Sequence, residues 1–478
     1  MFKKSFFFLL FFCLTLAGYA GEQVKYVFYF IGDGMGVNQV NGTQSFLAAL
    51  QGRIGVQPLC FSQFPYSAFV TTYSATNGVT DSAAAGTALA TGHKTKNSGL
   101  GVLADGKTPI QSIAAGARQA GAAVGVTTSV SVDHATPAAF YAHQPERNLY
   151  YAIGQDLIRA GFDFYAGSDF LDPNGGKDAP SLYEQCEEAG YTVLRGYPDF
   201  CKAMGGKGAK NRKMILLQPE EASAKDRKSL PYAIDRGDND LSLKQITRAA
   251  IQHLSKRSGK EGFFLMVEGG KIDFACHSND VATVFREVMD MDEAVREALG
   301  FYKKHPDETL IVVTADHETG GIVLGRGSYE QHTELLQYQK MSVEAYSDHV
   351  RQLCNEQGKN LTWETVEADL RDNWGFGDGV KLSDSQWQRL RNDFESMASG
   401  AAKDANSLYA SVNRLADSAR DIMARCALIG WQSGGHSNGY VPVFAIGAGA
   451  GNFHGQMDNT EISRVISRLT GWQLTEVE

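Results

Sequence analysis

The chain has 478 residues, of which 43% are hydrophobic, so it is long enough for one large α/β domain with insertions or for two to three ordinary domains. Its formal net charge is −9, which becomes −11 when the first twenty residues, with two lysines and no acidic residue, are left out. Because no long basic run is present, nucleic acid is not expected as a general partner: binding a phosphate backbone requires clustered Lys and Arg.

The first twenty residues have the pattern of a secretory signal peptide. Two lysines precede an apolar run over residues 6–17, and small residues follow up to Ala20. This run is short for a membrane span of about 20 residues, and the residues before Cys13 fit a lipoprotein signal poorly. We therefore expect cleavage of residues 1–20, no stable membrane anchor, and export to the periplasm or the extracellular space.

Short apolar runs rich in Val, Ile and Phe alternate with helical segments, which predicts an α/β fold with a mostly parallel central sheet flanked by helices. Open α/β sheets place their sites at the carboxyl ends of strands, so polar residues that follow such runs are expected to lie together. Four runs have this form: 24–31 before Asp33, 122–126 before Asp133, His134 and Thr136, 263–267 before Glu268, and 310–313 before Asp316 and His317.

Residues 326–430 differ from the rest of the chain, with long polar stretches rich in Gln, Glu, Asp and Arg. The stretches 342–357 and 383–399 predict amphipathic helices, with a turn at 375–379 between them. We interpret residues 326–430 as a helix-rich insertion. Its histidines, His332 and His349, are interpreted as surface residues.

The insertion divides a catalytic domain that comprises residues 21–325 and 431–478. The second part predicts a core strand at 441–446 and a helix at 461–469, with His436 on the glycine-rich loop before the strand.

Six cysteines follow the leader, and in an oxidising compartment they are either free thiols or disulfides. The most local candidate for pairing is Cys186 with Cys201, and Cys354 with Cys426 is a candidate for a longer-range bridge. The full set is Cys60, Cys186, Cys201, Cys276, Cys354 and Cys426.

Ser82 follows Asp81 at the start of a run of small, helix-compatible residues. A helix N-terminus would direct unpaired N–H groups at this serine, which suits attack on an anion. No histidine is near in sequence to act as its base, so a metal is the expected source of the alkoxide. The alternative for an isolated Asp-Ser pair is a simple helix N-cap.

Two further motifs carry ligand-type residues. Asp33 lies in G-D-G-M-G, whose spacing and internal acid do not fit a dinucleotide-binding loop. Asp273 and His277 can reach one metal from a single helical turn, as zinc would require; the alternative is a surface pair. The adjacent Cys276 is interpreted as a buried structural thiol.

Taken together, these motifs resemble those of alkaline phosphatases, outside residues 326–430. They occur in the family's order: G-D-G-M-G, T-D-S-A-x-x-G-T-A, A-T-P-A, an arginine eleven residues after Thr136, V-E-G-x-x-I-D-x-x-x-H, T-A-D-H and a late histidine flanked by glycine. The resemblance implies a three-layer sandwich with a crown-like or cap-like insertion, and a homodimer.

The resemblance also implies two zinc ions and one magnesium ion. One zinc would be held by Asp273, His277 and His436, and the second by Asp33, Asp316 and His317, with Ser82 facing it. Magnesium would be held by Asp33, Thr136 and Glu268. These ligand types suit those metals, because imidazole-rich sites select zinc and oxygen-only sites suit magnesium.

By the same resemblance, the chain hydrolyses phosphate monoesters to alcohol and inorganic phosphate. Ser82 would form a phosphoserine, Arg147 would bind the phosphate oxygens, and Asp81 would orient Arg147. Two zinc ions about 4 Å apart can clamp the attacking and leaving oxygens of an in-line displacement.

Two positions depart from the commonest family pattern. His134 stands near the third metal, where some relatives carry Asp, so a metal other than magnesium is an alternative there. Phe274 replaces a polar residue that contacts phosphate through water in many relatives. We therefore expect weaker inhibition by phosphate than in a Phe274→Lys variant.

The nearest alternatives are a phosphodiesterase, a sulfatase or a phosphoglycerate mutase of the same metal-dependent superfamily. Thr136, Arg147 and Glu268 at the family's spacing favour the monoesterase. A secreted metal-binding or phosphate-binding protein without catalysis is the alternative from another class, although every position needed for the chemistry holds a competent residue.

Overall fold

The computed structural model describes residues 24–176, 179–206, 208, 212–327 and 329–476. The predicted signal peptide lies outside these residues. Within them, no helix combines the length and the apolar character needed to cross a membrane.

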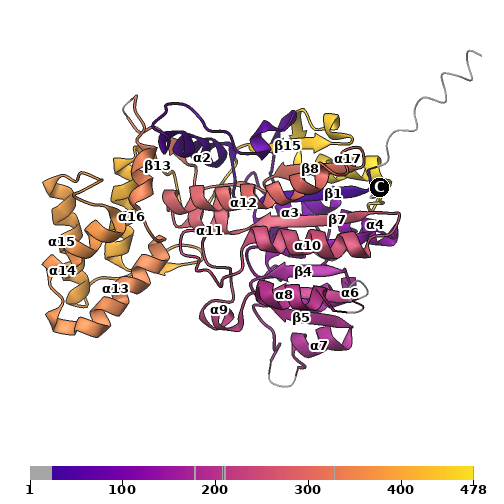
Figure 1. The fold of residues 1–478 in the computed structure, drawn as a ribbon, viewed down its shortest axis with the longest axis horizontal. Helices are drawn as coiled ribbons and strands as arrows, with labels where there is room; N and C mark the ends of the chain where they lie inside the picture. The colour runs from indigo at the N-terminus through magenta and orange to yellow at the C-terminus, as the bar shows by residue number, and fades with distance from the viewer. Residues whose placement is uncertain (1–23, 177–178, 207, 209–211, 328, 477–478) are drawn as a thin grey trace, which may run out of the picture.

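A ten-stranded sheet in the order β16-β2-β15-β8-β1-β7-β3-β4-β6-β5 forms the centre of the molecule (Figure 1). Every adjacent pair is parallel except the two pairs made by β15, so the predicted mostly parallel sheet is confirmed. The strands are β1 (Tyr26–Gly32), β2 (Tyr66–Thr71), β3 (Ala123–Thr128), β4 (Phe164–Gly167), β5 (Tyr191–Arg195), β6 (Lys213–Leu217), β7 (Phe263–Gly269), β8 (Thr309–Thr314), β15 (Val441–Gly447) and β16 (Gly455–Asp458).

Helices cover both faces of the sheet. Consecutive residues of a strand point to opposite faces. Phe28 of β1 packs against Phe301 of α12, with ring centroids 5.5 Å apart. The Tyr29 hydroxyl donates to the carbonyl of Leu89 in α3 over 3.4 Å. Helices α12 (Val281–Tyr302) and α3 (Ser82–Thr91) therefore lie on opposite faces.

The remaining helices extend these two layers. Helices α10 and α2 pack on α12, whereas α5 and α17 pack on α3. The helices outside the insertion that complete the set are α2 (Val37–Ala49), α4 (Ile113–Gln119), α5 (Ala135–Ala138), α6 (Tyr150–Ala160), α7 (Leu182–Glu188), α8 (Gly196–Met204), α9 (Glu220–Lys225), α10 (Leu243–Arg257), α11 (Lys271–His277) and α17 (Asn459–Thr470).

The described part of residues 326–430 contains four α-helices, which gather at one side of the sheet (Figure 1). The sequence predicts two of them, α13 (Val343–Gln357) and α15 (Asp384–Ala398). The predicted helix-rich character also covers α14 (Trp363–Trp374) and α16 (Arg414–Cys426), for which no separate bounds are predicted. The predicted turn begins at Gly375, whose φ of 68° ends α14 in a left-handed cap. The division into a catalytic domain and an insertion stays a prediction.

Candidate active site

The carboxyl ends of neighbouring parallel strands bring the predicted site residues to one edge of the sheet. In β1, Ile31 pairs with Glu268 of β7 on one side and with Thr314 of β8 on the other. Asp33 follows β1 directly and Asp316 lies two residues after the end of β8, while Glu268 also pairs with Thr128 at the end of β3. Three carboxylates from different parts of the chain therefore meet where the strands end.

Four carboxylates of this edge, Asp33, Glu268, Asp273 and Asp316, are fully buried. Each has one carboxylate oxygen without a hydrogen-bond partner among the described residues. Burial raises the pKa of Asp33 and of Asp316 well above the usual value, and the neighbouring carboxylates raise the pKa of each further. Such a concentration of buried acidic oxygens is costly unless a cation compensates it.

Three histidines present Nε2 to these carboxylates. Nδ1 of His277 lies 2.6 Å from the carbonyl oxygen of Gly434, and Nδ1 of His436 lies 2.8 Å from the carbonyl oxygen of Thr80. Nδ1 of His317 lies 3.2 Å from Oγ1 of Thr319. A partner at Nδ1 fixes the ring orientation and leaves Nε2 available, as is usual for histidines that bind metals.

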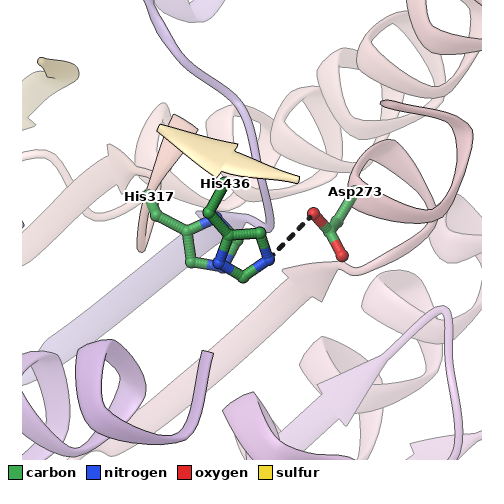
Figure 2. A group of neighbouring side chains, drawn as sticks. All are labelled: Asp273, His317 and His436. Carbon is green, nitrogen blue, oxygen red and sulfur yellow. Dashed lines mark ion pairs between the residues drawn. The ribbon is translucent and has the colours of Figure 1, made fainter. Parts of the chain in front are cut away.

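The short strands β14 (His436–Ser437) and β9 (Glu318–Thr319) place two of these rings together. They pair antiparallel, with His436 opposite Thr319. The rings of His317 and His436 stack with centroids 3.6 Å apart, and His436 Nε2 lies 3.8 Å from Asp273 Oδ1 (Figure 2). Nε2 of His277 lies 3.2 Å from both Asp273 Oδ2 and His436 Nε2.

The ligand-type atoms form three overlapping groups, and within each group the atoms lie within 4.8 Å of one another. One group has the composition expected for the second zinc site. In the second, His317 takes the place of His277. The third holds Asp33 and Glu268 of the expected magnesium set together with His134, and the expected Thr136 also lies against Asp33. The groups are Asp33, Asp316 and His317; Asp273, His317 and His436; and Asp33, His134 and Glu268.

This donor set fits divalent cations. Buried carboxylate oxygens without partners and imidazole nitrogens aimed at them are the ligands that such ions take in proteins. Burial and the neighbouring His436 lower the pKa of His317, which keeps its imidazole neutral and able to bind a metal. The thiol of Cys276 is buried beside the site, and burial raises its pKa well above the usual range, as expected of a structural thiol.

Ser82 begins α3 and is fully buried. Its Oγ lies 3.2 Å from Nε2 of His317. Asp81 is the N-cap: its Oδ1 accepts a hydrogen bond from the Ala84 amide over 3.0 Å. The N-cap interpretation of Asp81 therefore holds, and it is compatible with a reactive serine one residue later. All ten residues of α3 are buried, because its Ala, Gly, Ser and Thr side chains allow close packing against α17 and α5.

Arg147 joins the residues around the serine. Its Nη1 donates to Asp81 Oδ2 over 3.3 Å, and its Nη2 donates to His134 Nε2 over 3.1 Å. Thr136 Oγ1 lies 3.5 Å from Asp33 Oδ2. Every residue named for the site in the sequence therefore lies in this one region.

The histidines of the insertion lie in other surroundings. His332 is half-buried between Glu330 and Glu334. Nε2 of His349 lies 2.7 Å from Asp369 Oδ1. The six described cysteines are free thiols, so neither disulfide alternative is formed.

Sequence reasoning missed two residues at the site. The Thr319 hydroxyl donates to Asp273 Oδ1 over 2.6 Å. Tyr409, from the insertion, stacks on Phe274 with ring centroids 3.8 Å apart. The T-A-D-H-E-T spacing hints at Thr319, two residues after His317. No local signal distinguishes Tyr409 from the other tyrosines.

Known proteins of one family match this chain. A sequence profile described as "Alkaline phosphatase" matches residues 24–161 and 225–471. Alkaline phosphatase 3 of Bacillus subtilis is 31% identical over 463 residues, which cover 95% of this chain and 90% of that protein. The profile match continues through residues 326–430, where the sequence motifs showed no likeness, and it omits residues 162–224.

Solved structures agree with these sequence matches. The cold-active alkaline phosphatase of Shewanella sp. has a TM-score of 0.75 and 28% identity, and the match covers 93% of this chain and 99% of that one. The alkaline phosphatase of Thermus thermophilus has the same TM-score and identity, with 94% and 92% covered. A variant of the enzyme from the Antarctic bacterium TAB5, in which a histidine is replaced by glutamate, holds Mg in its M3 site; its TM-score is 0.65 at 26% identity, with 95% and 99% covered.

Proposed function

Because the chain belongs to the alkaline phosphatase family and is a phosphomonoester hydrolase, we propose that Ser82 accepts the phosphoryl group in a covalent intermediate. The observation that carries this proposal is the position of Ser82 Oγ, 3.2 Å from His317 Nε2 at the start of a buried helix. The amides at a helix N-terminus favour a negatively charged phosphoryl group there.

The proposed reaction has two displacements at phosphorus. The Ser82 oxygen forms a bond to phosphorus while the bond to the ester oxygen breaks, and the leaving alcohol gains a proton. Water then attacks the phosphoserine, which releases inorganic phosphate and restores the serine hydroxyl. Arg147 holds two phosphoryl oxygens through its forked N–H groups, and Asp81 orients its guanidinium.

The metals proposed for this site are two zinc ions and one magnesium ion. Asp273, His277 and His436 would hold one zinc; Asp33, Asp316 and His317 would hold the other; and Asp33, Thr136 and Glu268 would hold magnesium. Bound zinc supplies the charge that ionises the serine hydroxyl and stabilises the leaving oxygen. Because His134 faces Glu268, with Nδ1 3.8 Å from Oε1, a different third metal is the alternative.

We further propose that the enzyme is exported after cleavage of residues 1–20, acts in the periplasm or the extracellular space without a membrane anchor, and forms a homodimer. Residues 326–430 would act as a cap on the catalytic domain. Because the proposed metals and Arg147 address the phosphoryl group and leave the alcohol free, a broad range of phosphate monoesters is expected.

Three esters with the same leaving group test this function. The values of kcat/KM are compared for p-nitrophenyl phosphate, bis(p-nitrophenyl) phosphate and p-nitrophenyl sulfate, with Ser82→Ala as the control for the site. The proposal expects the monoester to be preferred and its hydrolysis to be lost in Ser82→Ala. A preference for the diester or the sulfate would assign the chain another substrate within the superfamily.

A further inference from the structure

A short hairpin of the insertion reaches the active site. Strands β11 (Ala405–Asn406) and β12 (Ser411–Val412) pair antiparallel, and the tip between them carries Leu408 and Tyr409. The tip contacts the region after α11, where Ser407 Oγ lies 3.4 Å from Ser278 Oγ. Leu408 is 63% exposed. The tip therefore turns its aliphatic side chain toward solvent and its aromatic one toward the site.

Three residues of the site surround the Tyr409 ring. It stacks on Phe274, with centroids 3.8 Å apart and planes 14° apart. It meets the ring of His277 edge to face at 5.3 Å and the ring of His134 at 6.3 Å. These contacts fix the orientation of the Tyr409 ring, and the position of the ring fixes the position of the phenol oxygen attached to it.

The phenol oxygen is buried beside the Arg147 side chain, and its O–H donates no hydrogen bond to any described residue. A buried hydroxyl in that condition is rare, because such groups normally find a partner. The Tyr409 ring faces the His134 ring, and His134 Nε2 accepts a hydrogen bond from Arg147 Nη2 over 3.1 Å, so Tyr409 and Arg147 lie in the same part of the site. A phenol is protonated at neutral pH, so the hydroxyl can donate a hydrogen bond.

We propose that Tyr409 donates a hydrogen bond to a non-bridging oxygen of the phosphoryl group held by Arg147, and that Phe274 is the positioning residue for its ring. The inference rests on the proposed function, since it needs a phosphoryl group at Arg147. It assigns the insertion a direct part in the site. It also gives Phe274 a role. Where many relatives have a polar side chain, Phe274 provides an aromatic surface that holds the Tyr409 ring and its hydroxyl in place.

The test replaces only the hydroxyl. In the metal-loaded full-length enzyme, Tyr409→Phe keeps the stacked ring, and we expect the inhibition constant for inorganic phosphate and the KM for p-nitrophenyl phosphate each to rise about ten-fold, as for the loss of a hydrogen bond to a charged group. Tyr329→Phe, the same change at a fully exposed tyrosine of the insertion, should leave both constants unchanged. An inhibition constant for Tyr409→Phe within two-fold of the wild-type value would overturn the proposal.

A second comparison tests whether Phe274 positions the Tyr409 ring or only contributes to the stability of the fold. Phe274→Leu should raise the phosphate inhibition constant, and adding Tyr409→Phe to it should raise the constant less than it does in the wild-type background. Fully independent effects would contradict the positioning role of Phe274. A lower melting temperature of Tyr409→Phe with unchanged constants would reduce Tyr409 to a structural role. Failure of the proposed function is distinguishable, because it would appear in the wild-type enzyme as an absence of phosphomonoester hydrolysis at Ser82.

Discussion

The Ser82 hydroxyl and the His317 imidazole, 235 positions apart in the sequence, lie 3.2 Å apart in the structure. Nε2 of His317 also lies 3.3 Å from Oδ1 of Asp33 and 3.3 Å from Oδ2 of Asp316. This is the position of a metal ligand. One cation could be bound by the imidazole nitrogen, the serine oxygen and the two carboxylate oxygens together. This arrangement links the proposed nucleophile, Ser82, to the proposed metal ligands.

Removal of single ligands should release different amounts of metal. Asp33 belongs to two of the three ligand groups, whereas Glu268 belongs to one. We expect Asp33→Asn to lose more metal per chain than Glu268→Gln, as measured by elemental analysis after dialysis. The exposed Asp378→Asn serves as the control. Equal losses in the two ligand variants would contradict the assignment of Asp33 to both sites.

The effect of a lysine beside the phosphate can be measured without disturbing Tyr409. In a Tyr409→Phe background, where no hydroxyl can be displaced, Phe274→Lys should lower the phosphate inhibition constant, because an ammonium group is placed near a dianion. Steady-state inhibition assays would check this. An unchanged or higher constant would show that position 274 does not face phosphate.

Acid should destabilise the fold through His253, which is fully buried on α10 with its ring centroid 5.7 Å from that of Phe164. Burial, helped by Arg257, lowers the pKa of His253 to about 4 from 6.5. The unfolded chain therefore binds a proton first as pH falls from 6.5 to 4, and the free energy of unfolding decreases across that window by up to about 3 kcal/mol.

His253→Gln should remove this contribution, so the difference in urea midpoint between wild type and variant should change between pH 6.5 and pH 4. The comparison cancels any loss of metal that both proteins share. A difference independent of pH would show that His253 is charged in the folded state or neutral in both states.

Asp280 joins the segment that contains Gln339 and Val343 to the N-terminus of α12. Its carboxylate accepts hydrogen bonds from the Thr283 hydroxyl at 2.7 Å, the Gln339 side chain at 2.9 Å and the Val343 amide at 2.8 Å. Asp280→Ala leaves these donors without their partner, and a loss of about 3 kcal/mol of stability is expected. Thermal unfolding would measure it against Asp378→Ala, which removes an exposed carboxylate. Equal melting temperatures would refute the role of Asp280.

The sequence predicts the parts of the fold that local patterns determine. The apolar runs at 24–31 and 263–267 correspond to β1 and β7, because a strand buried on both faces must be apolar throughout. The antiparallel direction of β15 is not predictable in this way, since its composition is that of any buried strand. Helix α14 has its buried residues Val366, Leu370 and Trp374 at helical spacing, so its local pattern also indicates a helix, although no separate bounds are predicted for it.

The residues of the candidate site also fall into those that local sequence patterns indicate and those that depend on tertiary contacts. Asp33, Ser82 and Asp316 stand out because strand ends and a helix start are readable from neighbouring residues. Tyr409 does not, because its place depends on a two-stranded hairpin in the insertion and on a stacked ring at position 274. Contacts between distant segments carry no local signal.

The most direct test of the account is to trap the covalent intermediate. The enzyme is mixed with p-nitrophenyl phosphate, quenched in acid and digested, and the phosphorylated peptide is identified by mass spectrometry. The account predicts phosphate on Ser82 in the wild-type protein and none in Ser82→Ala. Phosphate on another residue, or monoester hydrolysis that persists in Ser82→Ala, would contradict it.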